Sequence, residues 1–258
     1  MEKQRLTVIK VGGKIVEEQE TLNQLLDTFC TIQGKKVLVH GGGRSATRLA
    51  TQLGIESRMI EGRRITDEAM LNVVTMVYGG LVNKNIVAKL QARGINALGL
   101  TGADCNVLHA HKRPVDKIDW GYVGDIDKAD GNMLATLIDK DIVPIMAPLT
   151  HDGNGNLLNT NADTIAAETA KSLSPYYDVT LIYCFEHPGV MRNPDDSNSI
   201  ISDINSSTYK ELIADGTISG GMIPKIDNAF DALRNGVEKV IITKADAIDG
   251  VKGTRIAL

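Results

Sequence analysis

Cysteine and long apolar runs are both scarce in this sequence, and each shortage argues against a class of protein. The three cysteines, Cys30, Cys105 and Cys184, are odd in number and far apart, which argues against a disulfide framework and against a zinc cluster. We expect buried thiols in a reducing cytosol. No run of about eighteen apolar residues occurs and no apolar leader follows the first methionine, so we expect a cytoplasmic protein that is neither secreted nor inserted in a membrane.

An excess of positive charge is also missing. The chain has 28 Lys and Arg against 32 Asp and Glu, for a formal net charge of −4. This balance argues against nucleic acid as a partner and favours small charged metabolites. With 258 residues and 43% hydrophobic content, the chain can bury a large core in one or two domains.

Three familiar phosphate-binding or phosphate-transfer motifs are absent: the P-loop, the Gly-x-Gly-x-x-Gly dinucleotide fingerprint and the protein-kinase catalytic loop. Glycine-rich strand ends take their place. The apolar run at residues 37–40 stops at Gly41, Gly42 and Gly43, and helical spacing follows. Three glycines leave backbone N–H groups bare at a helix N-terminus, which favours an anion. A tight turn would explain one glycine but not three.

A second run, residues 6–11, ends at Gly12 and Gly13, so the two turns predict two walls of one phosphate site. Strand and helix patterns then alternate along the chain, which predicts an α/β doubly wound fold with ligands at the carboxyl ends of the strands. The expected strands are residues 6–11, 37–40, 95–100, 142–146, 179–183 and 239–242. The expected helices are residues 22–32, 43–53, 67–92 with an interruption at Gly79 and Gly80, 131–139, 162–173, 206–214 and 223–235.

Two segments depart from this alternation. Residues 105–125 favour a hairpin, which we interpret as a lid or rim, and residues 150–156 predict a turn between two short strands. His109 and His111 in the first segment would share one face of a strand, but two histidines without a third ligand make a weak metal site. Residues 172–178 are the best candidate for a domain boundary.

Several charged residues stand where chemistry could use them. Lys10 interrupts an apolar strand, so its ammonium group must reach solvent, a cleft or an anion. Lys225 follows a glycine pair and Pro224 in a helix start, where a solvated lysine is the alternative. Asn161 and Asp163 begin a helix, and N-capping alone explains much of that pattern. Arg64 could bind a carboxylate through two parallel hydrogen bonds, or its side chain could lie in solvent.

Together these motifs resemble the amino-acid kinase family. The matching segments are residues 9–13 (IKVGG), 40–43 (HGGG), 62–66 (GRRIT), 159–163 (NTNAD), 220–225 (GGMIPK) and 253–256 (GTRI). The resemblance covers the full length in order. It implies an open, mainly parallel sheet sandwiched between helical layers. It also implies an N-terminal acyl-amino-acid-binding and dimerisation domain, residues 1–174, and a C-terminal ATP-binding domain, residues 175–258.

The resemblance also implies roles for individual residues. Lys10 and Lys225 would flank the transferring phosphoryl group, and Asp163 would hold both lysines. The substrate would be bound by Gly41, Gly42, Gly43, Arg64 and Asn159. ATP would be bound by Gly12, Gly13, Glu186, Gly189, Val190, Ser219 and Gly220. Mg²⁺ would be held through the ATP phosphates. Residues 184–190 (CFEHPGV) depart from the family pattern Asp-Val-x-Gly-Val, which makes the adenosine contacts there the weakest of these expectations.

Within the family, the chain resembles the members that phosphorylate the side-chain carboxylate of N-acetyl-L-glutamate in arginine biosynthesis. A kinase for another N-acylated glutamate, such as N-succinylglutamate, is an alternative because the motifs specify the carboxylate clamp better than the acyl pocket. A non-catalytic amino-acid or nucleotide sensor on the same fold is another. The sensor would be favoured if Lys10, Asp163 or Lys225 were missing, and all three are present.

The first half of the long helical segment predicts a homodimer. Residues 67–78 carry six large apolar side chains, more than one face of a surface helix needs. Burial within the same chain is the alternative, but the resemblance places this segment at a two-fold interface. Arginine-inhibited hexameric members add a helix before the first strand, whereas five residues precede Leu6 here. We therefore expect a dimer that is insensitive to arginine.

Overall fold

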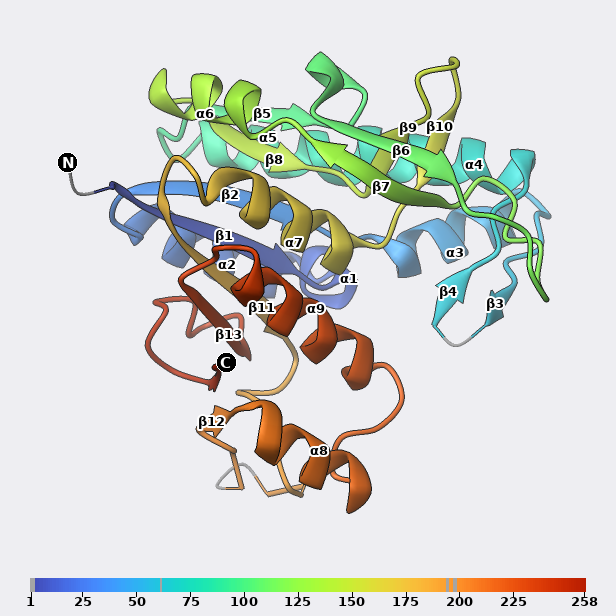
Figure 1. Ribbon diagram of the computed structural model, residues 1–258. Coiled ribbons are helices and arrows are strands. Elements are labelled where there is room, and N and C mark those ends of the chain that lie inside the picture. The colour runs from blue at the N-terminus through green and yellow to red at the C-terminus, as the bar shows by residue number, and fades with distance from the viewer. Residues whose placement is uncertain (1–2, 61, 194, 197–198) are drawn as a thin grey trace.

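The computed structural model describes residues 3–60, 62–193, 195–196 and 199–258. Within them, an eight-stranded sheet forms the centre of the molecule, in the order β12-β14-β13-β11-β1-β2-β8-β5 (Figure 1). Its strands are β1 (Arg5–Val11), β2 (Lys35–His40), β5 (Ala97–Leu100), β8 (Val143–Met146), β11 (Asp178–Phe185), β12 (Asp203–Ile204), β13 (Lys239–Lys244) and β14 (Thr254–Ile256). Neighbouring strands are parallel except β13 and β14, so the sheet is mainly parallel, as predicted.

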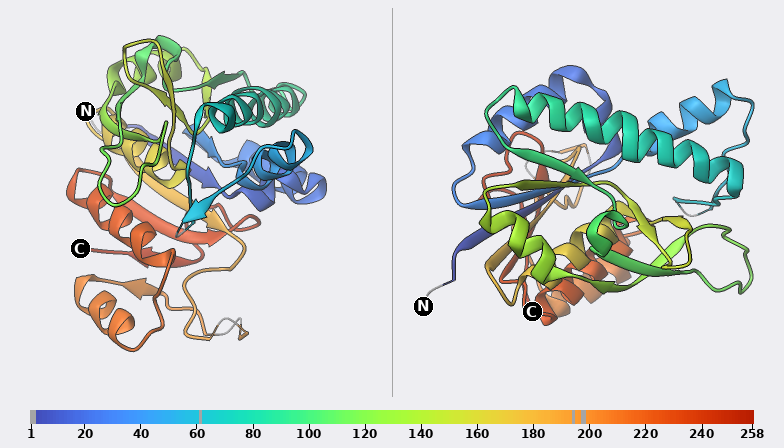
Figure 2. Two further views of the ribbon diagram at one scale, coloured as in Figure 1. Left: turned by 90° about the vertical axis from the view of Figure 1, so that its right-hand side faces the viewer. Right: turned by 90° about the horizontal axis from the view of Figure 1, so that it is seen from above.

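Helices cover both faces of this sheet. They are α1 (Gly13–Glu17), α2 (Gln19–Thr31), α3 (Gly43–Gln52), α6 (Gly131–Asp139), α7 (Ala162–Leu173), α8 (Ser206–Ala214) and α9 (Met222–Arg234), together with a long helix built from α4 (Glu68–Val74), a π-helical stretch (Thr75–Val82) and α5 (Asn83–Gln91). The long helix and α9 lie on opposite sides of the sheet (Figure 2). The prediction of an open α/β sheet between helical layers is confirmed. Among the described residues, none of the helices has the length and apolar character needed to span a bilayer.

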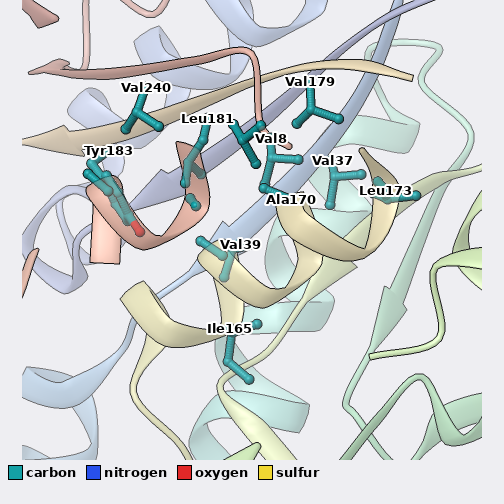
Figure 3. Close-up of a cluster of buried hydrophobic side chains, with 14 of the residues drawn as sticks. Val8, Val37, Val39, Ile165, Ala170, Leu173, Val179, Leu181, Tyr183 and Val240 are labelled. Carbon is teal, nitrogen blue, oxygen red and sulfur yellow. The ribbon is translucent and has the colours of Figure 1, made fainter. Parts of the chain in front are cut away.

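A hydrophobic core lies on each face of the main sheet, because side chains alternate between the two faces along each strand. Val8 and Val37 belong to the core beneath α7, whereas Ile9 and Leu38 belong to the core on the opposite face. Successive strand residues point to opposite faces, so a strand that is buried on both sides must be apolar at nearly every position. Figure 3 shows the first core, where strand valines meet Ile165 and other side chains of α7. Full burial of one such side chain contributes about 1.5–3 kcal/mol.

The interruption expected at Gly79 and Gly80 is wrong, because the helix continues through both as a π-helical stretch (Figure 2). Asp67 caps the start of the long helix, at α4, by accepting a hydrogen bond from Met70 N at 2.8 Å. A glycine pair costs only about 1 kcal/mol per residue in a helix, and packing against the sheet offsets it. A Cβ on Gly79 would lie 3.4 Å from Leu149 Cδ1.

Most of the large apolar side chains in the first half of this helix, which led us to expect a dimer interface, are buried within the chain itself. Met70, Val73, Val74 and Val77 are all buried in the core. Met76 remains 51% exposed, and Leu81, one turn further on, is 56% exposed. The alternative of burial within the chain therefore holds for most of the large apolar side chains of residues 67–78, and a smaller apolar surface is left.

A smaller sheet lies beside the main one. Its strands, in the order β10-β9-β6-β7, are β6 (Leu108–Lys112), β7 (Gly124–Ala129), β9 (Leu149–His151) and β10 (Leu157–Asn159). The predicted hairpin is confirmed, since β6 and β7 are antiparallel, although its second strand begins later than expected. The turn at residues 150–156 joins the antiparallel strands β9 and β10, as predicted.

The short strands β3 (Met59–Ile60), β4 (Arg63–Arg64), β12 and β14 were not predicted, because two or three residues do not establish a periodicity. The expected boundary near residue 174 falls between the end of α7 and the start of β11. One sheet continues across it through the pairing of β1 with β11. The division into two domains stays a prediction.

Candidate active site

The site forms where the carboxyl ends of three neighbouring strands meet. In the parallel register, Val11 of β1 lies beside His40 of β2 and Cys184 of β11, so the glycines that follow β1 and β2 come together. A Cβ on Gly41 would lie 3.0 Å from Gly13 N, and a Cβ on Gly42 would lie 3.0 Å from Tyr78 Cδ1. The two predicted glycine walls therefore touch, and the close approach leaves little room for side chains.

Two adjoining cavities open at this edge. The smaller, of about 220 Å³, is lined by Gly41, Gly42, Gly43, Arg64 and Asn159, among others. The larger, of about 590 Å³, is lined by residues that include Lys10, Gly12, Gly13, Asp163, Glu186 and Lys225. Five residues line both, namely Gly43, Gly62, Arg63, Asn161 and Thr164. The residues assigned to the acyl-amino acid and to the phosphates thus lie in neighbouring spaces that share a wall.

Lys10 and Lys225 come from distant parts of the chain to the larger cavity. Nζ of Lys10 lies 2.7 Å from Oδ1 of Asp163, and the two side chains are only 8% and 10% exposed. Burial lowers the pKa of Lys225, while the negative charge of Asp163 acts in the opposite direction. The solvated alternative does not match the buried Lys10, whereas Lys225 is half-buried in the wall of the cavity and its role stays a prediction.

The start of α7 serves two purposes. The Asn161 side chain caps the helix by accepting hydrogen bonds from the N–H groups of Asp163 at 2.7 Å and Thr164 at 3.3 Å. The N-capping interpretation is therefore confirmed. It coexists with the ion pair of Asp163, because capping uses the Asp163 backbone and the ion pair uses its side chain.

Arg64 is buried in the smaller cavity instead of lying in solvent. Its Nη2 donates to the Gly43 carbonyl oxygen at 2.8 Å and to Thr47 Oγ1 at 2.9 Å, and its Nη1 donates to Ser57 Oγ. Asn159 Nδ2 donates to Thr66 Oγ1 at 2.9 Å. Both side chains are therefore held by neighbouring groups of the same chain, and their role as a carboxylate clamp stays a prediction.

The expected nucleotide contacts divide into two groups. Gly12, Gly13 and Glu186 line the larger cavity, and Glu186 forms ion pairs with Lys14 at 2.9 Å and Arg44 at 3.6 Å. Ser219 and Gly220 directly precede Gly221, which also lines it. Val190 is instead buried, with its N–H donating to Thr254 Oγ1 at 2.8 Å. A Cβ on Gly189 would lie 2.7 Å from the same Thr254 Oγ1. The nucleotide roles of all these residues stay predictions.

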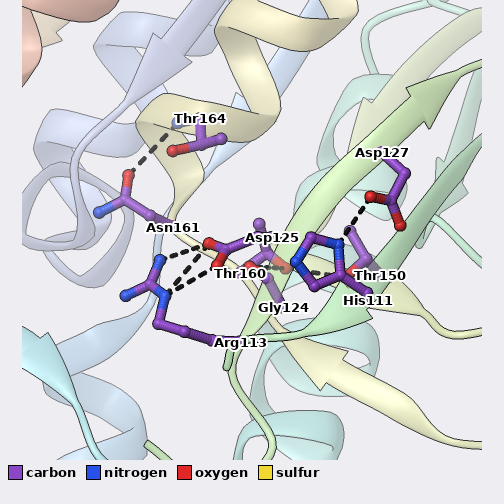
Figure 4. A network of polar contacts seen from close by, with 9 residues as sticks. All are labelled: His111, Arg113, Gly124, Asp125, Asp127, Thr150, Thr160, Asn161 and Thr164. Atoms are coloured by element: carbon purple, nitrogen blue, oxygen red, sulfur yellow. Dashed lines mark hydrogen bonds and ion pairs between the residues drawn. The ribbon is translucent and has the colours of Figure 1, made fainter. Parts of the chain in front are cut away.

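Arg113 was missed by the sequence analysis, although it lines the smaller cavity. Its Nε and Nη2 form a forked ion pair with Asp125, at 3.0 Å and 2.5 Å, and this hydrogen bonding lowers the pKa of Asp125 (Figure 4). The nearby His111 donates to Asp127 at 2.6 Å. Within the described ranges, no three His, Cys, Asp or Glu side chains are grouped so that they could hold a metal ion.

His40 was also missed as a site residue. It is fully buried, its Nδ1–H donates to the Gly41 carbonyl oxygen at 2.8 Å, and its Nε2 accepts from Asn83 Nδ2 at 3.1 Å. Asn83 also donates to the Ile145 carbonyl oxygen at 2.8 Å. His40 therefore ties the glycine turn to the long helix and to β8.

We expect His40 to make stability depend on pH. Burial lowers its pKa to about 4 in the folded chain, whereas an unfolded histidine titrates near 6.5. As pH falls below about 6.5, His40 is protonated in the unfolded chain but stays neutral in the folded chain. The free energy of unfolding should therefore decrease, by about 3 kcal/mol at pH 4. Urea unfolding between pH 4 and pH 7.5 measures this, with His40→Asn losing that part of the slope. A slope unchanged in His40→Asn, or equally changed in the exposed control His187→Asn, would contradict it.

Comparison with known proteins agrees with this geometry. The amino acid kinase family model matches residues 5–244. An acetylglutamate kinase of Bacteroides thetaiotaomicron is 64% identical over 254 residues, covering 98% of this chain and 99% of that protein. A solved structure from Streptococcus mutans has a TM-score of 0.79 at 29% identity and covers 98% of both chains.

A further solved structure is N-acetylglutamate synthase from Neisseria gonorrhoeae, in complex with coenzyme A and N-acetylglutamate. It has a TM-score of 0.82 at 26% identity, covering 100% of this chain and 60% of that one. The family resemblance inferred from the glycine, lysine and arginine motifs is thus confirmed over nearly the whole length. This chain belongs to the amino acid kinase family.

Proposed function

We propose that this chain is a kinase that transfers the γ-phosphoryl group of ATP to the side-chain carboxylate of N-acetyl-L-glutamate, a step of arginine biosynthesis. A carboxylate oxygen attacks the γ-phosphorus, the bond from that phosphorus to the β–γ bridging oxygen breaks, and ADP leaves. The product is an acyl phosphate. The observation that carries the proposal is the meeting of Lys10, Asp163 and Lys225 at the cavity that adjoins the Arg64 pocket. Relatives named acetylglutamate kinase at up to 64% identity support it.

The chemistry suits these residues. A glutamate side chain has a pKa near 4.3 and is already ionised at neutral pH, so no general base is required. The obstacle is repulsion between this carboxylate and the ATP phosphates. Two ammonium groups and the N–H groups of the glycine turns reduce the repulsion and align the reactants, which is how phosphoryl transfer is mainly accelerated.

Mg²⁺ would be held chiefly by the phosphate oxygens of ATP and would neutralise their charge. Among the residues that the structure describes, two carboxylates line the larger cavity, and both are engaged by cations. Asp163 pairs with Lys10, and Glu186 pairs with Lys14 and Arg44. Carboxylates that are already paired with cations fit a metal ion coordinated by the nucleotide phosphates better than one coordinated directly by side chains. We also propose a cytoplasmic location, as expected for a biosynthetic step that consumes ATP.

A direct assay tests the reaction. With ATP, Mg²⁺ and N-acetyl-L-glutamate, hydroxylamine should trap the acyl phosphate as a hydroxamate, and ADP should form in equal amount. Absence of hydroxamate above the no-substrate control, with all N-acylglutamates tried, would overturn the proposed function.

A second candidate acceptor, N-succinyl-L-glutamate, is favoured by the charge of the smaller cavity. Arg63 and Arg113 line it together with Arg64. An acetyl group is uncharged and needs no additional cation, whereas a succinyl group ends in a second carboxylate. Asp125 accepts from Nε and Nη2 of Arg113, and the third guanidinium nitrogen points away from Asp125 (Figure 4). That nitrogen could donate to an acyl carboxylate.

Arg113→Met should separate the two acceptors. A hydrogen bond to a charged group contributes about 1.5–3 kcal/mol, so kcat/KM for N-succinyl-L-glutamate should fall at least about tenfold. The value for N-acetyl-L-glutamate should change less than about threefold. Comparing N-acetyl-, N-succinyl- and free glutamate on both proteins measures this. Equal losses for both N-acyl substrates would remove the argument for the second candidate.

We further propose a homodimer formed through the long helix and the edge strand β5. Met76, Leu81 and, on β5, Leu98 are exposed, and an edge strand offers unpaired backbone groups to a second copy. Met76→Glu combined with Leu81→Glu should convert the dimer to a monomer in sedimentation velocity. Ile213→Glu is the control, because it adds charge at an exposed apolar residue of α8, which lies at the opposite end of the molecule from α5 and β5 (Figure 1). A wild-type monomer, or a dimer that survives the double substitution, would contradict the proposal.

A further inference from the structure

An aromatic side chain stands beside both lysines of the larger cavity. Phe185 ends β11 and lines this cavity. Nζ of Lys225 lies 4.0 Å from the centroid of its ring, and Nζ of Lys10 lies 4.7 Å from it. Both distances are within the range in which an ammonium group is attracted to the negative face of an aromatic ring, about 6 Å.

The ring is held in place by the same elements that hold the lysines. Tyr183, two residues earlier on the same face of β11, stacks on Phe185 with 6.2 Å between ring centroids and 12° between planes. Tyr183 is fully buried, and its hydroxyl donates to the Asp163 carbonyl oxygen at 3.3 Å. Lys10 lies beside Tyr183 in the register of β1 and β11. The two rings, Asp163 and Lys10 therefore form one packed unit, and Lys225 reaches it from α9.

The charges in this unit explain why an aromatic ring suits the holding of the two lysines better than a second carboxylate. Asp163 lies 2.7 Å from Lys10 and forms an ion pair with it, and its negative charge also acts on Lys225 without a direct ion pair. A second carboxylate beside them would hold the lysines but would also repel the phosphates of ATP. A ring attracts cations through its quadrupole and carries no net charge, so it can hold them without opposing the nucleotide.

We infer that Phe185 is a positioning residue whose ring holds the ammonium groups of Lys10 and Lys225 toward the phosphate cavity, an inference that rests on the kinase function proposed above. The ring limits the positions that the flexible lysine side chains occupy before ATP binds. Less ordering of these side chains is then needed when the phosphoryl group is transferred.

Kinetics with Phe185→Leu, which keeps apolar volume and removes the ring, test the role. We expect kcat to fall about tenfold, with the KM for ATP changed less than about threefold and the melting temperature nearly unchanged. Phe185→Tyr keeps a ring and should retain most of the activity. Phe230→Leu is the matched control, because Phe230 belongs to α9 and its ring lies near Arg234 instead of the lysines. An active Phe185→Leu enzyme with wild-type kcat would overturn the inference while leaving the proposed function intact.

A spectroscopic measurement makes the test independent of activity. Protons above an aromatic ring shift upfield in NMR, so the ε-methylene signals of Lys225, assigned by their loss in Lys225→Met, should lie upfield of those of exposed lysines. They should return to the usual position in Phe185→Leu and stay shifted in Phe230→Leu. Signals at the usual position in the wild type would overturn the inference whether or not the enzyme is active. A shifted signal in a protein that makes no acyl phosphate would support the contact and reject the proposed reaction.

Discussion

Replacing Lys225 by alanine should lower kcat at least about a hundredfold. A charged contact made to the transferring group in the transition state contributes on the order of 3 kcal/mol, and the half-buried Lys225 lines the cavity where phosphoryl transfer is proposed. Lys225→Met removes the charge and keeps most of the alkyl volume, so it should show the same loss with little change in stability. The hydroxamate assay measures both variants.

Lys210→Ala provides the control for Lys225. Lys210 lies on α8, is exposed and can lose its charge without touching either cavity. The kcat of the Lys210→Ala enzyme should match that of the wild type. A Lys225→Ala enzyme within about threefold of the wild type would return Lys225 to the solvated-helix interpretation and remove it from the transfer step.

Removing Asp163 should cost stability as well as activity. Asp163→Ala would leave the ammonium group of Lys10 buried without the carboxylate that now lies 2.7 Å away. Breaking a buried ion pair on one side typically destabilises a protein by about 3–5 kcal/mol. We expect a loss of about 3 kcal/mol in the free energy of unfolding, measured by urea denaturation, and a loss of kcat at least as large as that of Lys225→Ala.

The double substitution Lys10→Met with Asp163→Ala separates the two effects. Because it removes both charges, it should recover most of the stability lost in Asp163→Ala. Together with Lys10→Met alone, these variants form a double-mutant cycle that gives the coupling between the two residues. Activity should not recover, since neither the ammonium group nor its orienting carboxylate is present. An Asp163→Ala protein as stable as the wild type would show that the ion pair contributes nothing to folding. Recovery of kcat in the double variant would remove Lys10 and Asp163 from the mechanism.

The part of the site that the sequence predicted is the part that local backbone requirements determine. Apolar runs that stop at Gly12 and at Gly41 indicate buried strands and tight turns, because strand burial and close backbone approach each restrict the residues at their own positions. Parallel strands have their carboxyl ends at one edge, so the strand pattern also predicted that these turns would meet. Spacing and the family resemblance added Lys10, Lys225 and Asp163, which the structure brings to one cavity.

Other features depend on contacts between segments far apart in the sequence, and only the tertiary structure decided them. The chain by itself covers Val73 and Val77 and leaves Met76 exposed, which no count of apolar residues in the helix could determine. Arg113, which follows β6, reaches the smaller cavity only because this part of the chain lies beside the glycine turns. Phe185 meets Lys225 only because the start of α9 lies near the end of β11. Periodicity and propensity describe the neighbours of a residue along the chain, whereas charge pairing, burial and cation–ring contacts depend on its neighbours in space.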